Sequence, residues 1–264
     1  MVRWSSLREA LVLSLKNWRL WLMQFTGNAI IFALFVGWLR VPDAHWWELL
    51  FQVLLILASL ASILVLHGGT LAYFQSAHAD HEGQLLPAFR KALKHVAALA
   101  VCLFVLLLVW GLIGHLYNYE TSFPGYLRSG FPRWLRRMIS EPALDNTYTF
   151  LLFVLRWVIL PGLLLPFVLF CAERGFRGFV AFRDWGKTVP SLAYWIALVV
   201  AAIIGVYFVQ LVMGWRLDPR SSTLRGEQAS FITRQLLAYI LALFSWLFVA
   251  STLGRASRAA QPSA

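Results

Sequence analysis

The chain has little charge. Only 13% of its 264 residues are Asp, Glu, Lys or Arg, whereas an ordinary soluble domain has roughly 25% charged residues. Because 60% of the residues are hydrophobic, too few polar side chains remain to cover a water-soluble globule. The composition therefore predicts an integral membrane protein.

Catalytic motifs are also missing. The sequence contains no His-Glu-x-x-His for zinc proteolysis, no Gly-x-Ser-x-Gly elbow, no phosphate-binding Gly-rich loop and no Cys-x-x-Cys pair. The apolar runs contain no Asp or Glu, the side chains on which proton-coupled pumps and intramembrane aspartyl chemistry depend. No polar segment is long enough to form a soluble catalytic domain. We therefore expect no enzymatic activity and no cofactor.

Six apolar runs reach the ~20 residues that a transmembrane helix needs. They are residues 20–39, 49–74, 97–117, 148–172, 192–215 and 231–253. The sequence thus predicts an all-α, polytopic membrane bundle of six transmembrane helices, arranged as three hairpins. A single transmembrane domain would cover residues 1–254, and residues 255–264 would form a flexible tail.

A basic amphipathic segment precedes a span three times. When Lys16, Lys94 and Lys187 are placed in register, an alanine lies six residues before each lysine, and a leucine or phenylalanine lies five residues before it. The pattern predicts three hairpins, each introduced by a helix in the membrane interface. The basic side chains expected to contact anionic lipid headgroups there are Arg90, Lys91, Lys94, Arg183 and Lys187.

The distribution of basic residues predicts the orientation. If both termini are cytosolic, 13 of the 23 lysines and arginines lie on the cytosolic side, 9 lie outside and one lies within a span. We therefore expect a multi-pass protein of the bacterial cytoplasmic (inner) membrane. Scattered basic residues do not form the single basic face that nucleic acid requires, so no nucleic-acid partner is expected. Residues 131–139, in the outer connection, predict a short helix on the membrane surface.

One arginine lies deep inside a predicted span. Arg156 lies about seven residues into the fourth apolar run, and must find a partner, line a wet cavity or reach the interface. Gln210 and Asn28 are polar residues in two other spans. Together these three could bind an anionic ligand or line a polar path. The alternative is that the amides only link helices by hydrogen bonds and that the arginine snorkels.

The sequence offers one possible metal site. His78 and His81 are three residues apart in a short inner connection, and Glu82 follows. Imidazole and carboxylate groups at this spacing bind transition metals, but a solvated turn has the same composition. Cys102 and Cys171 both lie in apolar runs, where reduced thiols packed between helices are the default.

Three functions remain open from the sequence. The first is a non-enzymatic, lipid-associated bundle or a subunit of a membrane complex, whose partners are the bilayer and other membrane proteins. The second is a transporter or channel component with a polar path near Arg156 and Gln210. The third is a lipid-modifying enzyme that uses residues 78–82. Accessibility of the two cysteines to aqueous reagents distinguishes a wet path from a packed bundle.

A family resemblance extends over the whole chain as a pattern. The segment Leu7-Arg8-Glu9-Ala10-Leu11, the Ala-Phe-Arg steps at Ala88 and Ala181, and the six spans with basic inner loops resemble a group of uncharacterised bacterial six-helix inner-membrane proteins. That group is similar to the membrane domain fused to some glycerophosphodiester phosphodiesterases. The catalytic barrel of those enzymes has no counterpart in this chain, so the resemblance implies a membrane fold and no catalytic activity.

Overall fold

The protein is an all-helical membrane bundle in the part of the chain that the structure describes. The computed structural model describes residues 4–77, 84–119, 122–216 and 223–260. Six of its helical segments are long and apolar enough to cross a membrane, which confirms the predicted fold class. They are α2 (Trp18–Arg40), α3 (Trp46–Ser76), α5 (Val96–Leu116) with η1 (Tyr117–Tyr119), α8 (Glu141–Val154) continued through η2 (Leu155–Ile159), α9 (Leu160–Arg174) and η3 (Gly175–Val180), α11 (Leu192–Ala202) continued through η4 (Ile203–Phe208) and α12 (Val209–Gly214), and α13 (Leu224–Ala260).

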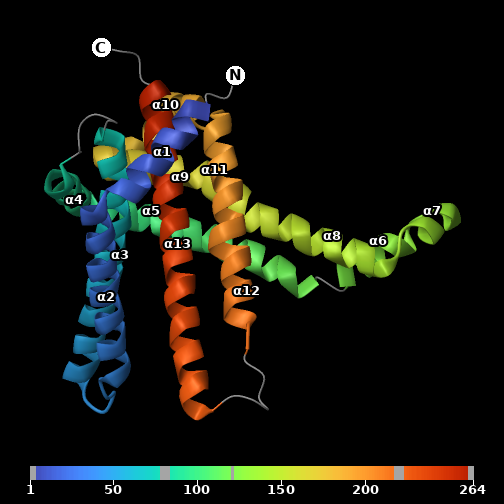
Figure 1. The fold of residues 1–264 in the computed structure, drawn as a ribbon, viewed down its shortest axis with the longest axis horizontal. Coiled ribbons are helices and arrows are strands. Elements are labelled where there is room, and N and C mark those ends of the chain that lie inside the picture. The colour runs from blue at the N-terminus through green and yellow to red at the C-terminus, as the bar shows by residue number, and fades with distance from the viewer. Residues whose placement is uncertain (1–3, 78–83, 120–121, 217–222, 261–264) are drawn as a thin grey trace.

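Each of the three hairpins begins with a short helix at the same end of the molecule. These helices are α1 (Trp4–Lys16), α4 (Leu85–Lys94) and α10 (Phe182–Thr188), and they lie at the top of Figure 1 with the last turns of α13. The residue that follows the repeated lysine is polar in every case: Asn17, His95 and Thr188. The Asn17 side chain donates to the Tyr73 hydroxyl, and Nδ1 of His95 lies 3.0 Å from the Ala172 carbonyl oxygen. At two of the three junctions between a short helix and the span that follows it, a polar contact therefore links the junction to the second helix of the same hairpin.

Helix α13 is the centre of the fold. It packs against α1, α3, α10, α11, η4 and α12, and we call this assembly, together with α2, the central bundle. Close approach depends on small residues, because a Cβ atom placed on Gly254 would lie 2.5 Å from the Phe74 carbonyl oxygen. A Cβ atom on Gly205 would lie 2.7 Å from Cβ of Ser245. Such contacts let helix backbones meet where no water is present to drive association.

The end of α13 differs from the sequence prediction. Instead of a flexible tail from residue 255, the helix continues to Ala260. Its last turns have partners: Arg255 pairs with Glu9, and Nη1 of Arg258 donates to the carbonyl oxygens of Phe74 (2.7 Å) and Gln75 (2.9 Å) and also to that of Ala77. These carbonyls belong to the C-terminal end of α3, where a cation is favoured. Tertiary contacts that no local pattern reveals therefore extend the helix.

The second hairpin runs across the others. Figure 1 shows α5 and α8 lying across the direction shared by α2, α3, α12 and α13, with α6 (Ser122–Ser129) and α7 (Arg133–Met138) at their far end. We call the segment from α5 to η2 the crosswise hairpin. Its arms are joined by aromatic contacts, since Trp110 and Trp157 pack edge to face and the Tyr148 hydroxyl donates to the Leu116 carbonyl. The predicted surface helix of residues 131–139 corresponds to α7, on which Trp134 and Met138 are exposed.

The fourth span is irregular where it leaves the bundle. At η2 the backbone forms a π-helical turn, in which the Leu160 N–H bonds to the Leu155 carbonyl. Pro161 follows directly and has no N–H to continue an α-helical ladder. A Cβ atom on Gly162 would lie 2.5 Å from the Trp195 ring, so α9 and α11 approach closely at this point. Proline and glycine therefore fix the turn at the root of the crosswise hairpin.

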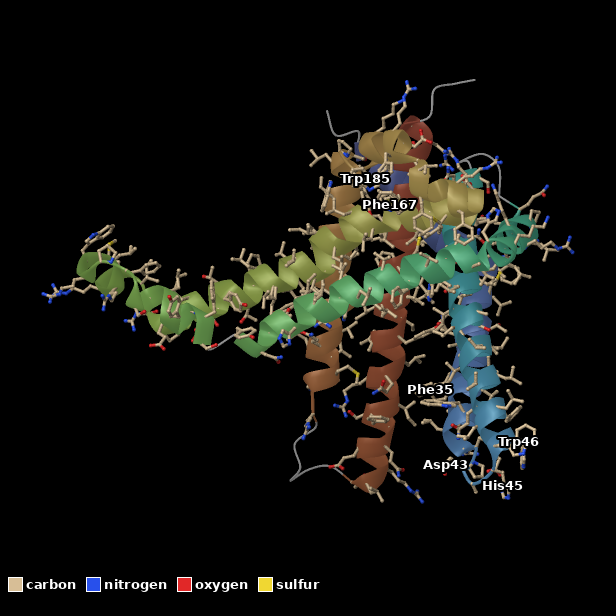
Figure 2. All side chains as sticks on the ribbon, turned by 180° about the vertical axis from the view of Figure 1, so that it is seen from behind. Phe35, Asp43, His45, Trp46, Phe167 and Trp185 are labelled. Carbon is tan, nitrogen blue, oxygen red and sulfur yellow. The ribbon has the colours of Figure 1, made fainter. Side chains whose placement is uncertain are left out.

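Tryptophans mark the two ends of the bundle. Figure 2 shows Asp43, His45 and Trp46 at the tip of the α2–α3 hairpin, and Trp185 at the opposite end of the molecule near Phe167. The rings of Phe167 and Trp185 stack with their centroids 5.3 Å apart. Amphipathic rings prefer the headgroup layer, so tryptophans at both ends of the molecule are what a membrane-spanning bundle requires.

Candidate functional site

The main candidate site is a groove between the first hairpin and α4. It has a volume of about 590 Å³ and lies along α2 and α3, with α4 at one end. We call it the α2–α4 groove. Its lining is mostly apolar, with one cation and two hydroxyls: Arg19, Leu22, Met23, Thr26, Gly27, Ile30, Ala61, Ser62, Val65, Leu66, Phe89 and Leu93.

Small residues shape the groove. A Cβ atom on Gly27 would lie 2.7 Å from the Leu66 side chain, so glycine lets α2 and α3 meet at this level. A Cβ atom on Gly69 would lie 2.6 Å from the Phe89 ring, which therefore rests directly on the α3 backbone. The buried Phe89 anchors α4 to α3, while Leu93 is exposed and lines the groove. The result is an apolar channel closed at one end by an amphipathic helix.

The groove has a charged end and an apolar body. Arg19 is the second residue of α2, and its guanidinium lies 5.9 Å from the Trp18 ring. Ile30 lines the groove eleven residues further along the helix, which corresponds to ~16 Å at 1.5 Å per residue. A single cation at the level of the interfacial helices and an apolar channel below it match the two parts of a phospholipid.

Helix α4 adds further positive charge beside this end. Arg90, Lys91 and Lys94 are exposed on it, while Ala88 and Ala92 are buried. Nζ of Lys91 lies 3.7 Å from a carboxylate oxygen of Glu173. The other predicted interfacial cations, Arg183 and Lys187, are exposed on α10 in the third hairpin. They lie at the same end of the molecule but do not line the groove.

Arg156 occupies a different place. Its guanidinium carbon lies 4.1 Å from the centre of the Trp110 ring and 5.6 Å from that of Tyr117, both in the crosswise hairpin. Its Nε atom is buried and has no hydrogen-bond partner. The attraction between a cation and the face of an aromatic ring stabilises such a charge.

The structure does not bring together the other two polar residues of the predicted path. Asn28 donates to the Gln24 carbonyl at 2.8 Å, beside the buried bond from Gln24 to the Thr70 hydroxyl (2.5 Å). Gln210 is exposed on α12, which packs against α13. Asn28, Arg156 and Gln210 therefore lie on three different spans, and among the described residues α2, η2 and α12 have no extensive contact with one another.

The remaining predicted residues give no site. His78, His81 and Glu82 lie outside the described residues. Among the residues that are described, no group of three or more His, Cys, Asp or Glu side chains could hold a metal ion. Cys102 and Cys171 are free and buried, and their side chains are within hydrogen-bonding reach of each other between α5 and α9. They lie in a packed core.

Sequence reasoning missed the residue at the head of the groove. Arg19 contributes to the charge bias, but the pattern gives no sign that it faces an apolar channel, because the channel depends on α4 folding back onto α3. It also missed Arg258 and Arg234, which donate to the C-terminal carbonyls of α3 and α12. The polar residue directly after a repeated lysine is the sequence feature that could have predicted the contacts of Asn17 and His95.

Comparison with known proteins gives no relative for this chain: no protein family, no characterised protein and no solved structure matches it significantly. Its function must therefore be inferred from the site.

Proposed function

We propose that this protein is a non-enzymatic, multi-pass protein of the bacterial inner membrane that binds an anionic phospholipid in the α2–α4 groove. The observation that supports the proposal is the combination of Arg19 at one end with an apolar lining along the rest. The headgroup phosphate would contact Arg19, and an acyl chain would lie beside Met23, Gly27 and Val65. In this role the protein is a lipid-associated bundle that can serve as a subunit of a membrane complex.

Electrostatics favours an anionic headgroup. Arg90, Lys91 and Lys94 lie on the adjoining helix, and each basic residue near a membrane surface attracts anionic lipid by ~1 kcal/mol. With both termini in the cytosol, as the basic residues favour, the groove opens at the inner leaflet, which has the negative surface potential. Burial of both cysteines and the separation of Arg156 from Gln210 argue for a packed bundle and against a continuous polar path.

Native mass spectrometry of the purified protein tests the proposal. Nanodiscs of phosphatidylcholine containing a minor fraction of phosphatidylglycerol would supply the two lipids in competition. We expect the wild type to retain phosphatidylglycerol preferentially. The Arg19→Gln variant should lose about fivefold in this preference, the equivalent of ~1 kcal/mol, and Ala61→Phe should lose bound lipid of both kinds by filling the channel.

The matched control is Arg40→Gln, which removes a cation from the opposite end of the same helix, where the side chain is exposed. It should retain lipid like the wild type. Equal lipid retention by the wild type and the Arg19→Gln and Ala61→Phe variants would exclude the groove as the binding site.

A further inference from the structure

A second cationic feature lies outside the groove. Arg156 differs from the arginines that have carboxylate partners, such as Arg128 with Glu141 (3.2 Å) and Arg174 with Asp184 (2.6 Å). Among the described residues Arg156 takes part in no hydrogen bond and no ion pair. A cation in a membrane span without a counter-charge is costly, so its position needs an explanation.

The guanidinium lies over the face of the Trp110 ring. The ring of Trp110 lies 4.1 Å from the guanidinium carbon, and Trp110 is held in turn by Trp157, whose ring packs edge to face at 4.7 Å. The N–H groups of a guanidinium lie in its plane and are not used by contacts to the face. Because Nε is buried, the donors open to a ligand are the N–H groups of the terminal nitrogens Nη1 and Nη2, and among the described residues they have no acceptor.

The guanidinium lies near the end of α5. Tyr117, 5.6 Å away, is the first residue after that helix. The Tyr148 hydroxyl bonds to the Leu116 carbonyl at 3.0 Å, which places the two tyrosines at one level. Arg156 lies eight residues further along the fourth span, ~12 Å along the helix axis, and its side chain extends back toward these tyrosines. Tyrosine rings favour the layer in which lipid phosphates lie.

The surface near the cation is apolar. Phe150, Leu151 and Ile159 are exposed along the same helical span, before and after Arg156. A lipid bound there would place its phosphate at the guanidinium and its acyl chains against apolar side chains of this span.

We propose that Arg156, placed over the Trp110 ring beside Tyr117, is an oxyanion site that binds the phosphate of a lipid headgroup. A free phosphate has the same chemistry and is the competing source. Planar bidentate N–H groups suit a phosphate better than a point charge does. The site is independent of Arg19, so either site can exist without the other.

Counting bound lipids tests this site separately from the groove. Native mass spectrometry from mixed phosphatidylcholine and phosphatidylglycerol nanodiscs would be applied to wild type, Arg156→Gln, Arg19→Gln and the double variant. We expect each single variant to lose one tightly held phosphatidylglycerol and the double variant to lose two. Loss of one charge-assisted contact should weaken the Arg156 site about tenfold or more. Arg40→Gln, at the exposed end of α2, is the control and should lose none.

A second measurement covers variants that fold poorly and separates the two sources. The thermal midpoint of wild type and of Arg156→Lys would be recorded in phosphatidylcholine nanodiscs with added inorganic phosphate, and again with phosphatidylglycerol replacing part of the lipid. A rise with phosphatidylglycerol that is smaller in Arg156→Lys supports the headgroup site, because lysine keeps the charge without the planar donors. A response to inorganic phosphate alone would overturn the lipid assignment. An unchanged lipid count in Arg156→Gln, or equal midpoint shifts in wild type and Arg156→Lys, would overturn the site.

Discussion

The central bundle and the crosswise hairpin contain helices of similar hydrophobicity that are assembled in different ways. In α13, the central helix, 56% of the most apolar window is buried inside the protein, compared with 22% in the α5 span and 28% in the fourth span, while the other spans of the bundle have 11–17%. The bundle uses glycines, hydroxyls and capping arginines at its contacts, whereas the hairpin uses aromatic rings packed edge to face and one cation. Apolar sequence alone therefore decides that a helix enters the membrane and does not decide how much of it other helices cover.

The difference also concerns freedom of movement. Helix α8 has no extensive packing with any helix of the central bundle within the described residues, since its main neighbours are η2 and α6. The tip of the hairpin holds Arg133, Arg136 and Arg137, which favour water and headgroups over hydrocarbon. Interfacial anchors of this kind set the tilt of a helix when packing does not. We expect the bilayer, through these arginines, to fix the tilt of the crosswise hairpin.

Glycine substitutions should give the largest difference between the two regions in the free energy of unfolding. In Gly254→Leu, the first side-chain carbon would meet the Phe74 backbone at 2.5 Å, and a backbone cannot move aside as a side chain can. We expect the free energy of unfolding, measured by denaturant titration in detergent, to fall by ~3 kcal/mol or more.

The matched control for this change is Gly111→Leu in α5, where an added Cβ atom would meet nothing within 4 Å. It should leave the free energy of unfolding within ~1 kcal/mol of wild type, because leucine has the better helix propensity. Similar losses in the two variants would mean that α5 is packed as tightly as α13, and the contrast between the regions would be lost.

Removing a capping arginine should have the next largest effect. In Arg258→Met the apolar stem remains, but the carbonyls of Phe74 and Gln75 at the end of α3 lose their charged donor. Hydrogen bonds to a charged group contribute ~1.5–3 kcal/mol, so we expect the free energy of unfolding to fall by ~2 kcal/mol. Arg137→Met on the exposed arm should change it by less than ~0.5 kcal/mol. If both variants unfold alike, the contacts of Arg258 do not stabilise the helix end.

Much of the fold follows from the sequence, because the bilayer imposes it. Apolar run length predicts all six spans, and the register of Lys16, Lys94 and Lys187 predicts the three interfacial helices. These features are local. The orientation in the inner membrane and the family resemblance stay predictions.

The parts that sequence reasoning missed depend on contacts between distant segments. The α2–α4 groove forms because Phe89 rests on Gly69, and α13 extends beyond residue 255 because Arg258 reaches α3. No periodicity in either segment contains this information. Arg156 was recognised as unusual from its place in an apolar run, but its stacking on Trp110 required the fold of the hairpin, in which the two residues lie 46 positions apart.

A single buried hydroxyl gives the smallest and most specific test of the comparison. Thr70 accepts a hydrogen bond from Gln24 at 2.5 Å in the core between α2 and α3. Thr70→Val keeps the shape and leaves the Gln24 amide without this acceptor. Hydrogen bonds between transmembrane helices are worth ~0.6 kcal/mol on average and at most ~1.7, so we expect the free energy of unfolding to fall by ~1 kcal/mol.

Tyr148→Phe removes the corresponding bond of the crosswise hairpin, from the Tyr148 hydroxyl to the Leu116 carbonyl, at an exposed position. Because water or a lipid headgroup can replace the lost hydroxyl there, the free energy of unfolding should change by less than ~0.5 kcal/mol. The polar group left behind is a buried amide, that of Gln24, in the first variant and an exposed carbonyl, that of Leu116, in the second. If Tyr148→Phe proves the more damaging, the hairpin is held together by its polar contacts rather than by its rings, and the distinction between the two regions must be redrawn.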